Sequence, residues 1–102
     1  MFNGMGNAGN MQGMMKKVQK MQAEMMKMQE ELKTRTVETT VGGGALTIVA
    51  NGKKEIESIK IKPEAIDPDD VEMLQDMIVS GVNEALRKID EMTEREMSKI
   101  TG

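Results

Sequence analysis

Three lysines close together, Lys16, Lys17 and Lys20, are the residues whose type and spacing first suggest a chemistry. An ammonium group is a strongly hydrated point charge that binds phosphate oxygens well. Cations near the start of a helix gain nothing from the helix dipole, so helix capping does not explain these three residues. We call them the lysine cluster. They suggest a phosphate-binding surface, and the alternative is an ordinary solvated helix face.

The other reactive residue types are scarce. The chain has no cysteine and no histidine, which excludes a thiolate nucleophile, a Ser-His pair and the usual transition-metal ligands. Carboxylates are plentiful, but no spacing singles out an acid/base pair, so we expect no enzyme, no cofactor and no small-molecule substrate. The acidic run Asp67, Asp69, Asp70 and Glu72 lacks the twelve-residue calcium-loop pattern, and a helix start explains it, so we expect no metal site.

Thirteen of the 102 residues are methionine, and many lie in one regular stripe. Spacings of three and four alternate, a period of 3.5 that keeps one side of a helix against a partner helix over several turns. A soft metal such as Cu(I) is the alternative, but thioether coordination does not require a heptad. We call these residues the methionine stripe: Met11, Met14, Val18, Met21, Met25, Met28 and Leu32.

The stripe predicts a first helix from about residue 11 to residue 33. Residues 1–10 are rich in Gly and Asn and have no period, so we expect a disordered N-terminal arm there and a single domain over residues 11–102. At 1.5 Å per residue, the helix is a rod of roughly 30 Å.

Strand patterns follow the helix. Residues 36–41, 45–50 and 55–62 alternate or are rich in Thr, Val and Ile, with an expected bulge near Glu57-Ser58 because Ile56 is out of phase with Ile59. Three glycines at 42–44 join the first two strands, so a hairpin turn is favoured there over a phosphate-binding loop, which precedes a helix. Asn51-Gly52 predicts a two-residue type I′ turn. Together these segments predict a three-stranded antiparallel meander.

A second long helix is expected after residue 67. Asp67 suits the N-cap, Pro68 the first helical position, and Ile66 with Val71 a hydrophobic staple. The apolar face runs from Val71 through Met92, with Gly81 in it as a sign of close packing, and the helix ends near Lys99. A helix of about 30 residues is too long for this sheet to cover, so its end should project. The predicted fold class is α+β.

Charge and composition limit the partners. Residues 1–35 carry six basic and three acidic side chains, whereas residues 67–102 carry four basic and ten acidic ones. The first helix is therefore locally basic in a chain of net charge −3. One aromatic residue makes a small core, which favours oligomerisation. No signal peptide or membrane-spanning stretch is evident, so we expect a cytoplasmic protein without a membrane partner.

Four sequence strings resemble the YbaB/EbfC family of bacterial nucleoid-associated proteins. They are KKVQKMQAEM at 16–25, VGGGALTIVANG at 41–52, IKIKPEAIDPDDVEMLQDMIVSGVNEAL at 59–86 and RKIDEMTEREM at 87–97. The resemblance covers nearly the whole chain from about Met11. It implies a tweezer-like homodimer whose long helices project from a shared core, and a protein that binds double-stranded DNA and influences nucleoid organisation and gene expression.

Carried over by position, the resemblance implies DNA contacts along both helical arms, namely Lys16, Lys17, Lys20, Lys27, Arg95 and Lys99. Phosphate contact with release of counterions would supply the affinity, with little reading of bases. We assign the dimer interface to the stripe and the glycine-rich hairpin: Met14, Val18, Met21, Met25, Met28, Leu32, Gly43, Leu46 and Ile48. The alternative function is an oligomeric adaptor that docks onto another protein through its projecting helices.

Overall fold

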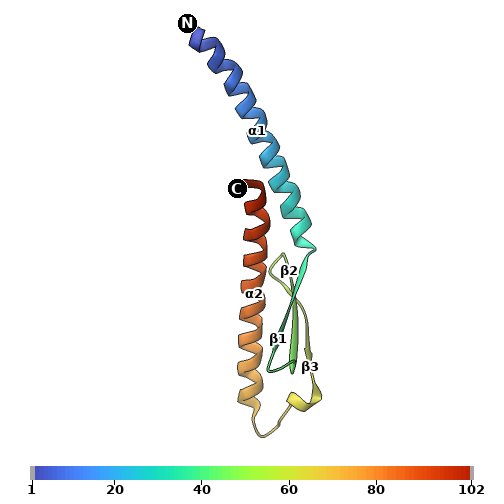
Figure 1. The fold of residues 1–102 in the computed structure, drawn as a ribbon. Helices are drawn as coiled ribbons and strands as arrows, with labels where there is room; N and C mark the ends of the chain where they lie inside the picture. The colour runs from blue at the N-terminus through green and yellow to red at the C-terminus, as the bar shows by residue number, and fades with distance from the viewer. Residues whose placement is uncertain (1, 102) are drawn as a thin grey trace.

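The computed structural model describes the backbone of residues 2–101 and the side chains of residues 11–101. In chain order, the elements are α1 (Phe2–Lys33), β1 (Thr36–Val41), β2 (Leu46–Asn51), β3 (Ile56–Ile61), a short 3-10 turn η1 (Pro63–Ala65) and α2 (Val71–Thr101). Figure 1 shows the sheet beside α2 and α1 extending beyond both. The predicted order of helix, meander and helix is confirmed. The arm predicted over residues 1–10 falls on residues whose side chains lie outside those described, and it stays a prediction.

The three strands form an antiparallel sheet in the order β1-β2-β3. Thr39 pairs with Ile48 and Ile48 with Ile59, so these residues share one face. Between Val49 and Ala50 the β2–β3 register shifts, because Val49 pairs with Ser58 and Ala50 with Ile56. The expected bulge is therefore confirmed, and it returns Ile56 to the face that holds Ile59.

The two hairpin turns differ in their chemistry. Gly42, Gly43 and Gly44 all have positive φ, which only glycine adopts without strain. After β2, the predicted type I′ turn is wrong, since the positive φ of 64° falls on Lys54 and four residues, 52–55, connect β2 to β3. The side-chain oxygen of Asn51 accepts hydrogen bonds from the backbone N–H groups of Lys53 and Glu55 and fixes this longer loop.

Gly52 is needed for close packing and not for its φ angle. Its N–H donates to the carbonyl oxygen of Arg35 at 3.0 Å, and an added Cβ would overlap the backbone carbonyl of Leu32. The end of α1 therefore rests directly on the β2–β3 turn.

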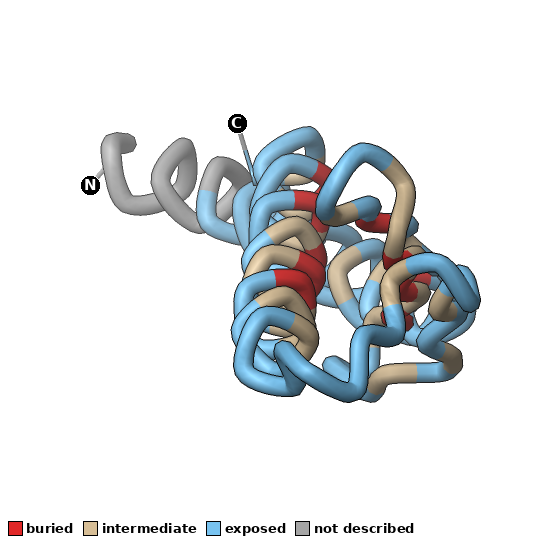
Figure 2. The backbone as a smooth tube through the Cα atoms, turned by 90° about the horizontal axis from the view of Figure 1, so that it is seen from below, coloured by how far each residue is buried: buried red, intermediate tan, exposed pale blue. Residues whose placement is uncertain are grey.

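One side of α2 packs on the face of the sheet that holds Ile48. Figure 2 shows the buried positions of α2 turned toward the strands. The core cluster consists of Leu32, Ile48, Ala50, Ala85, Ile89 and Met92. The close packing expected at Gly81 is confirmed, because an added Cβ would overlap the side chains of Ile48 and Val41.

The start of α2 differs from the prediction. The side chain of Asp70 accepts a hydrogen bond from the N–H of Met73 at 3.2 Å, so Asp70 is the N-cap. Asp67 instead closes the preceding turn, accepting from the N–H of Asp69 at 2.9 Å. The predicted staple is wrong for the same reason: Ile66 and Val71 lie on either side of that turn and are 56% and 50% exposed.

The molecule is 82 Å long and only 18 by 16 Å across. Its radius of gyration is 22.2 Å, against about 13 Å for a compact domain of this size. The C-terminal end of α2 extends past the sheet, as predicted, and lies beside the second half of α1 (Figure 1). The N-terminal half of α1 continues beyond it as a single rod.

Candidate nucleic-acid interface

The lysine cluster lies on the projecting half of α1. Lys16, Lys17 and Lys20 are all exposed, and none of them makes an ion pair with another side chain in the described part of the chain. No acidic residue precedes Glu24 in the sequence. At 3.6 residues per turn, Lys16 and Lys20 lie on the opposite side of the helix from Met14 and Met21. This part of α1 therefore presents a cationic side and an apolar side.

The other predicted DNA-binding residues have acidic neighbours. Lys27 lines a shallow hollow with Glu24, Glu31 and the side chain of Ile100 from α2. Two carboxylates beside one ammonium reduce its attraction for phosphate. The structure does bring the end of α2 to Lys27, so the two predicted contact regions are adjacent.

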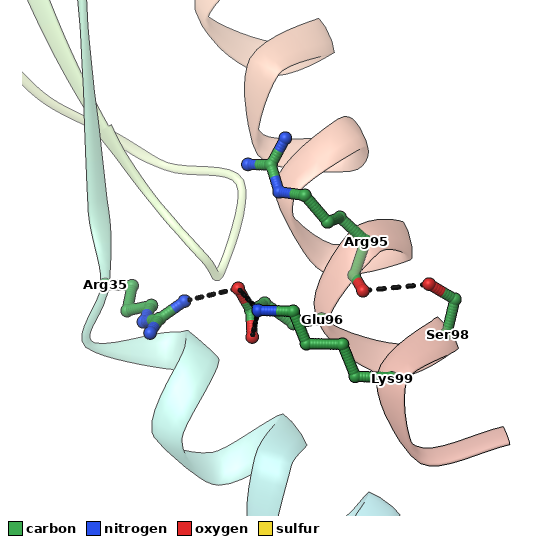
Figure 3. A network of polar contacts seen from close by, with 5 residues as sticks. All are labelled: Arg35, Arg95, Glu96, Ser98 and Lys99. Carbon is green, nitrogen blue, oxygen red and sulfur yellow. Dashed lines mark hydrogen bonds and ion pairs between the residues drawn. The ribbon is translucent and has the colours of Figure 1, made fainter. Parts of the chain in front are cut away.

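Lys99 is held by a carboxylate, whereas Arg95 makes no ion pair with another side chain of residues 11–101. The ammonium group of Lys99 lies 3.1 Å from Oε1 of Glu96, and the same oxygen lies 3.2 Å from the guanidinium of Arg35. Figure 3 shows these three side chains meeting between α1 and α2, with the guanidinium of Arg95 pointing away from them. Arg95 instead lines a hollow with Glu91 and Glu94, so it too has carboxylates nearby.

Glu96 is the residue that sequence reasoning missed. Its side chain is only 12% exposed, although it is charged. Hydrogen bonds donated by Lys99 and Arg35 hold the pKa of its carboxyl below the ordinary value of 4.5, although burial opposes this shift. A signal was present: the spacing of Ala85, Ile89 and Met92 continues to position 96, where an apolar residue is expected and a glutamate stands.

The methionine stripe is divided in two by the length of α2. In its inner half, Leu32 is 3% exposed, and Met25 and Met28 are half-buried where α2 lies beside α1. The outer half lies beyond the end of α2, and its side chains are exposed: Met11 61%, Met14 64%, Val18 51% and Met21 38%. The partner helix of the inner half is therefore α2 of the same chain, and the outer half has no covering element among the described residues.

The residues assigned to the dimer interface lie in three environments. Leu32, Leu46 and Ile48 are buried inside the core of the chain itself. Gly43 is exposed at the tip of the β1–β2 turn. The remaining residues belong to the stripe, and Met14, Val18 and Met21 are the ones that keep free apolar surface. The dimer assignment stays a prediction.

Two kinds of feature are absent from the described part of the chain. None of the helices in the described part of the chain has a stretch long and apolar enough to cross a bilayer. Among residues 11–101, no three potential metal-ligating side chains gather at one point.

Known proteins resemble this chain in sequence over almost its whole length. The model of the YbaB/EbfC DNA-binding family matches residues 5–102. A nucleoid-associated protein of Ruminiclostridium cellulolyticum is 63% identical over 101 residues, which are 99% of this chain and 88% of that protein. A nucleoid-associated protein of Desulforamulus reducens is 66% identical over 94 residues, which are 92% and 90% of the two chains.

A solved structure shares the fold. The crystal structure of an uncharacterised protein from Helicobacter pylori superimposes with a TM-score of 0.69 at 21% identity, over 83% of this chain and 89% of that one. The family match over nearly the whole sequence and the high identity to its relatives lead to one conclusion. This chain belongs to the YbaB/EbfC DNA-binding family.

Proposed function

We propose that this protein is a homodimeric, non-enzymatic DNA-binding protein of the bacterial nucleoid, which binds double-stranded DNA mainly through phosphate contacts. The observation that supports it is the lysine cluster, which is exposed on a projecting helix and makes no ion pair with the side chains of residues 11–101. The family and the names of its relatives supply the class of ligand. The fold supplies a rod that reaches away from the acidic body of the molecule.

Phosphate contact is favoured over base recognition by the side chains on α1. Lysine binds phosphate as a point charge, whereas base-specific contacts rely on planar donor and acceptor groups. The only aromatic residue of the sequence is Phe2, so aromatic stacking on single strands has little support. We therefore expect weak sequence preference and an effect on DNA organisation and gene expression in the cytoplasm that follows from occupancy of many sites.

The proposed dimer is supported by the outer half of the methionine stripe. This surface continues the interface that α2 makes with the inner half, and it keeps the same spacing of three and four residues. A second copy of the chain offers the matching stripe. Dimerisation doubles the number of lysine clusters, and simultaneous binding of both to one duplex raises the apparent affinity.

Salt-dependent binding to a duplex tests the proposal. The wild-type chain is compared with K16E/K17E/K20E and with the matched control K53E/K60E/K62E, which makes the same charge change on exposed lysines of the sheet region. Each lost phosphate contact lowers the slope of log K against log salt by about 0.9. We expect the α1 variant to lose most of its affinity and slope, and the control to keep more of both.

If both variants lose the same affinity and slope, the change in net charge explains the loss. The assignment of the DNA contacts to α1 is then wrong. A wild-type chain that fails to bind duplex DNA at low salt would favour the adaptor function, for which the exposed apolar side of α1 is the supporting observation.

A further inference from the structure

The methionines of α1 are unusually accessible. Five of them are between 38% and 68% exposed: Met11, Met14, Met15, Met21 and Met26. In contrast, Met92 of the core is 6% exposed. The sequence contains no cysteine, so thioethers are the only sulfur groups that an oxidant meets.

We propose that the outer half of the methionine stripe is an oxidation site, at which hydrogen peroxide converts Met11, Met14 and Met21 to methionine sulfoxide and thereby weakens self-association of the chain. The consequence for association rests on the proposed dimer. In the reaction, a lone pair on sulfur attacks one oxygen of peroxide and the O–O bond breaks. Sulfur is oxidised by two electrons, peroxide is reduced, and the products are the sulfoxide and water.

The physical effect follows from the polarity of the new group. A sulfoxide oxygen accepts hydrogen bonds, and burying it against an apolar surface leaves it without a donor. The stripe of a second copy offers only thioethers and the methyl groups of Val18 in the outer half. Oxidation therefore opposes association. Peroxide reacts with the dissociated chain, in which this surface is exposed. The oxidised chain then associates less readily.

The fold is expected to survive this reaction. Met92 is shielded in the core, and Met28 and Met97 pack against that core. Among the described residues of the outer half of α1, none belongs to the core cluster. Limited oxidation thus changes the surface of the arm and leaves α2 on the sheet.

Two methionines provide an internal control. Met15 and Met26 are 59% and 68% exposed but lie off the stripe, on a flank of α1. Their oxidation adds the same oxygen atom to the same helix without changing the surface that the second copy covers. The variant M11L/M14L/M21L keeps the outer half of the stripe apolar and removes the oxidisable sulfur from that half, and M15L/M26L is its matched control.

The experiment uses the full chain treated with limiting peroxide. Peptide mass spectrometry locates the sulfoxides, circular dichroism checks the fold, and sedimentation velocity gives the dissociation constant before and after treatment. We expect sulfoxide at the exposed methionines of α1 well before Met92. For wild type and M15L/M26L the dissociation constant should rise by about tenfold or more, and methionine sulfoxide reductase should restore it. For M11L/M14L/M21L it should stay unchanged.

The outcomes separate the two proposals. Sulfoxide at Met11 and Met14 with an unchanged dissociation constant overturns the oxidation site but leaves the dimer intact. A dissociation constant that rises equally in M11L/M14L/M21L also overturns it. An untreated wild-type chain that is monomeric, measured first, overturns the proposed dimer and with it this inference.

Discussion

Glu96 is a charged residue at an apolar position, and it joins three parts of the molecule. It stands on α2, it accepts hydrogen bonds from Lys99 one turn further along, and it is paired with Arg35 at the point where α1 gives way to β1. A carboxylate shielded from water needs such partners, because removing its charge from water is otherwise costly. The base of the α1 arm is therefore held by a polar contact inside an apolar interface.

This contact predicts an acid-sensitive contribution to stability. The pKa of Glu96 is lowered in the folded chain, so its contribution is present above the ordinary value of 4.5 and is lost as the pH falls through the lower, folded pKa. Urea denaturation of wild type and E96Q across this range measures the effect. The difference in unfolding free energy should be largest near neutral pH and shrink below about pH 4.5. A difference that is constant with pH would show that the charge is not involved.

Thr39 is a buried polar residue without such partners. It is 2% exposed, and its Oγ1 has no hydrogen-bond partner among the described residues. Replacing the hydroxyl with a methyl group of similar size should remove a desolvation penalty. We expect T39V to raise the unfolding free energy by about 1 kcal/mol. T40V, at an exposed position of the same strand, is the control and should change it little.

Gly81 is a residue of α2 that packs closely against the sheet. Alanine is the better helix former, by about 1 kcal/mol, but its Cβ would overlap Ile48 and Val41. Because the core is close-packed, we expect overpacking to dominate and G81A to lower the unfolding free energy by about 1–3 kcal/mol. S80A on the exposed side of the same helix turn tests propensity alone. A stabilised G81A chain would mean that the sheet moves aside easily.

At the scale of elements, the start of α2 shows which of two nearby aspartates caps the helix. Asp70 accepts a hydrogen bond from the third residue of the helix, and Asp67 accepts one inside the preceding turn. The Asp67-Pro68 pair satisfies the sequence rule for a helix start. In the structure, however, this pair forms a turn before the helix, and α2 begins at Val71, three residues after Pro68.

The caps predict unequal costs. D70A should lower the unfolding free energy by about 1 kcal/mol, the typical value for a lost N-cap. D67A removes an equal charge from the same region but only a turn contact, so its effect should be smaller. Urea denaturation of both variants gives the comparison. If D67A proves the more damaging, the helix starts at the earlier aspartate in solution.

The two helices differ in what supports them. α2 packs on the sheet over much of its length, whereas among the described residues of α1 those of its second half lie against another element. An isolated helix of about 12 residues is marginal in water, so the outer half of α1 depends on its rigid continuation into the supported half or on a partner. For this reason, the proposed dimer would also stabilise the outer half of α1 as a helix.

At the scale of the whole molecule, shape is the property that matters most for the proposed function. A chain of 102 residues that extends over 82 Å exposes far more surface than a compact domain. The extension separates the lysine cluster from the acidic part of α2, which favours the proposed contact of these cations with phosphate.

The shape and the dimer are tested together in solution. Light scattering should give twice the mass of one chain at micromolar concentration, and small-angle scattering should give a radius of gyration of at least the 22.2 Å of the single chain. M14E/V18E should return the mass to that of one chain, because a carboxylate in the covered stripe costs several kcal/mol. K16E/K20E, which alters the opposite side of α1, should leave the mass unchanged.

The sequence by itself determined the order of elements and the faces that they bury. Periods of 3.5 and 2 are properties of local backbone geometry, so the stripe on α1, the bulge in β3 and the packing role of Gly81 were predictable from residue spacing. The resemblance to a DNA-binding family was equally a matter of sequence. The lysine cluster was also predictable, because the positions of the lysines are given by the sequence and helix geometry determines the side of the helix on which each one lies.

Only the tertiary structure decided which surfaces remain free. It placed Leu46 and Ile48 in the core, covered one half of the stripe with α2 and left the other half open, and paired Lys99 with Glu96. It also moved the cap of α2 from Asp67 to Asp70 and lengthened the turn at Gly52. These outcomes depend on how elements that are distant in the sequence lie relative to one another in space. Local sequence patterns carry no information about those relative positions.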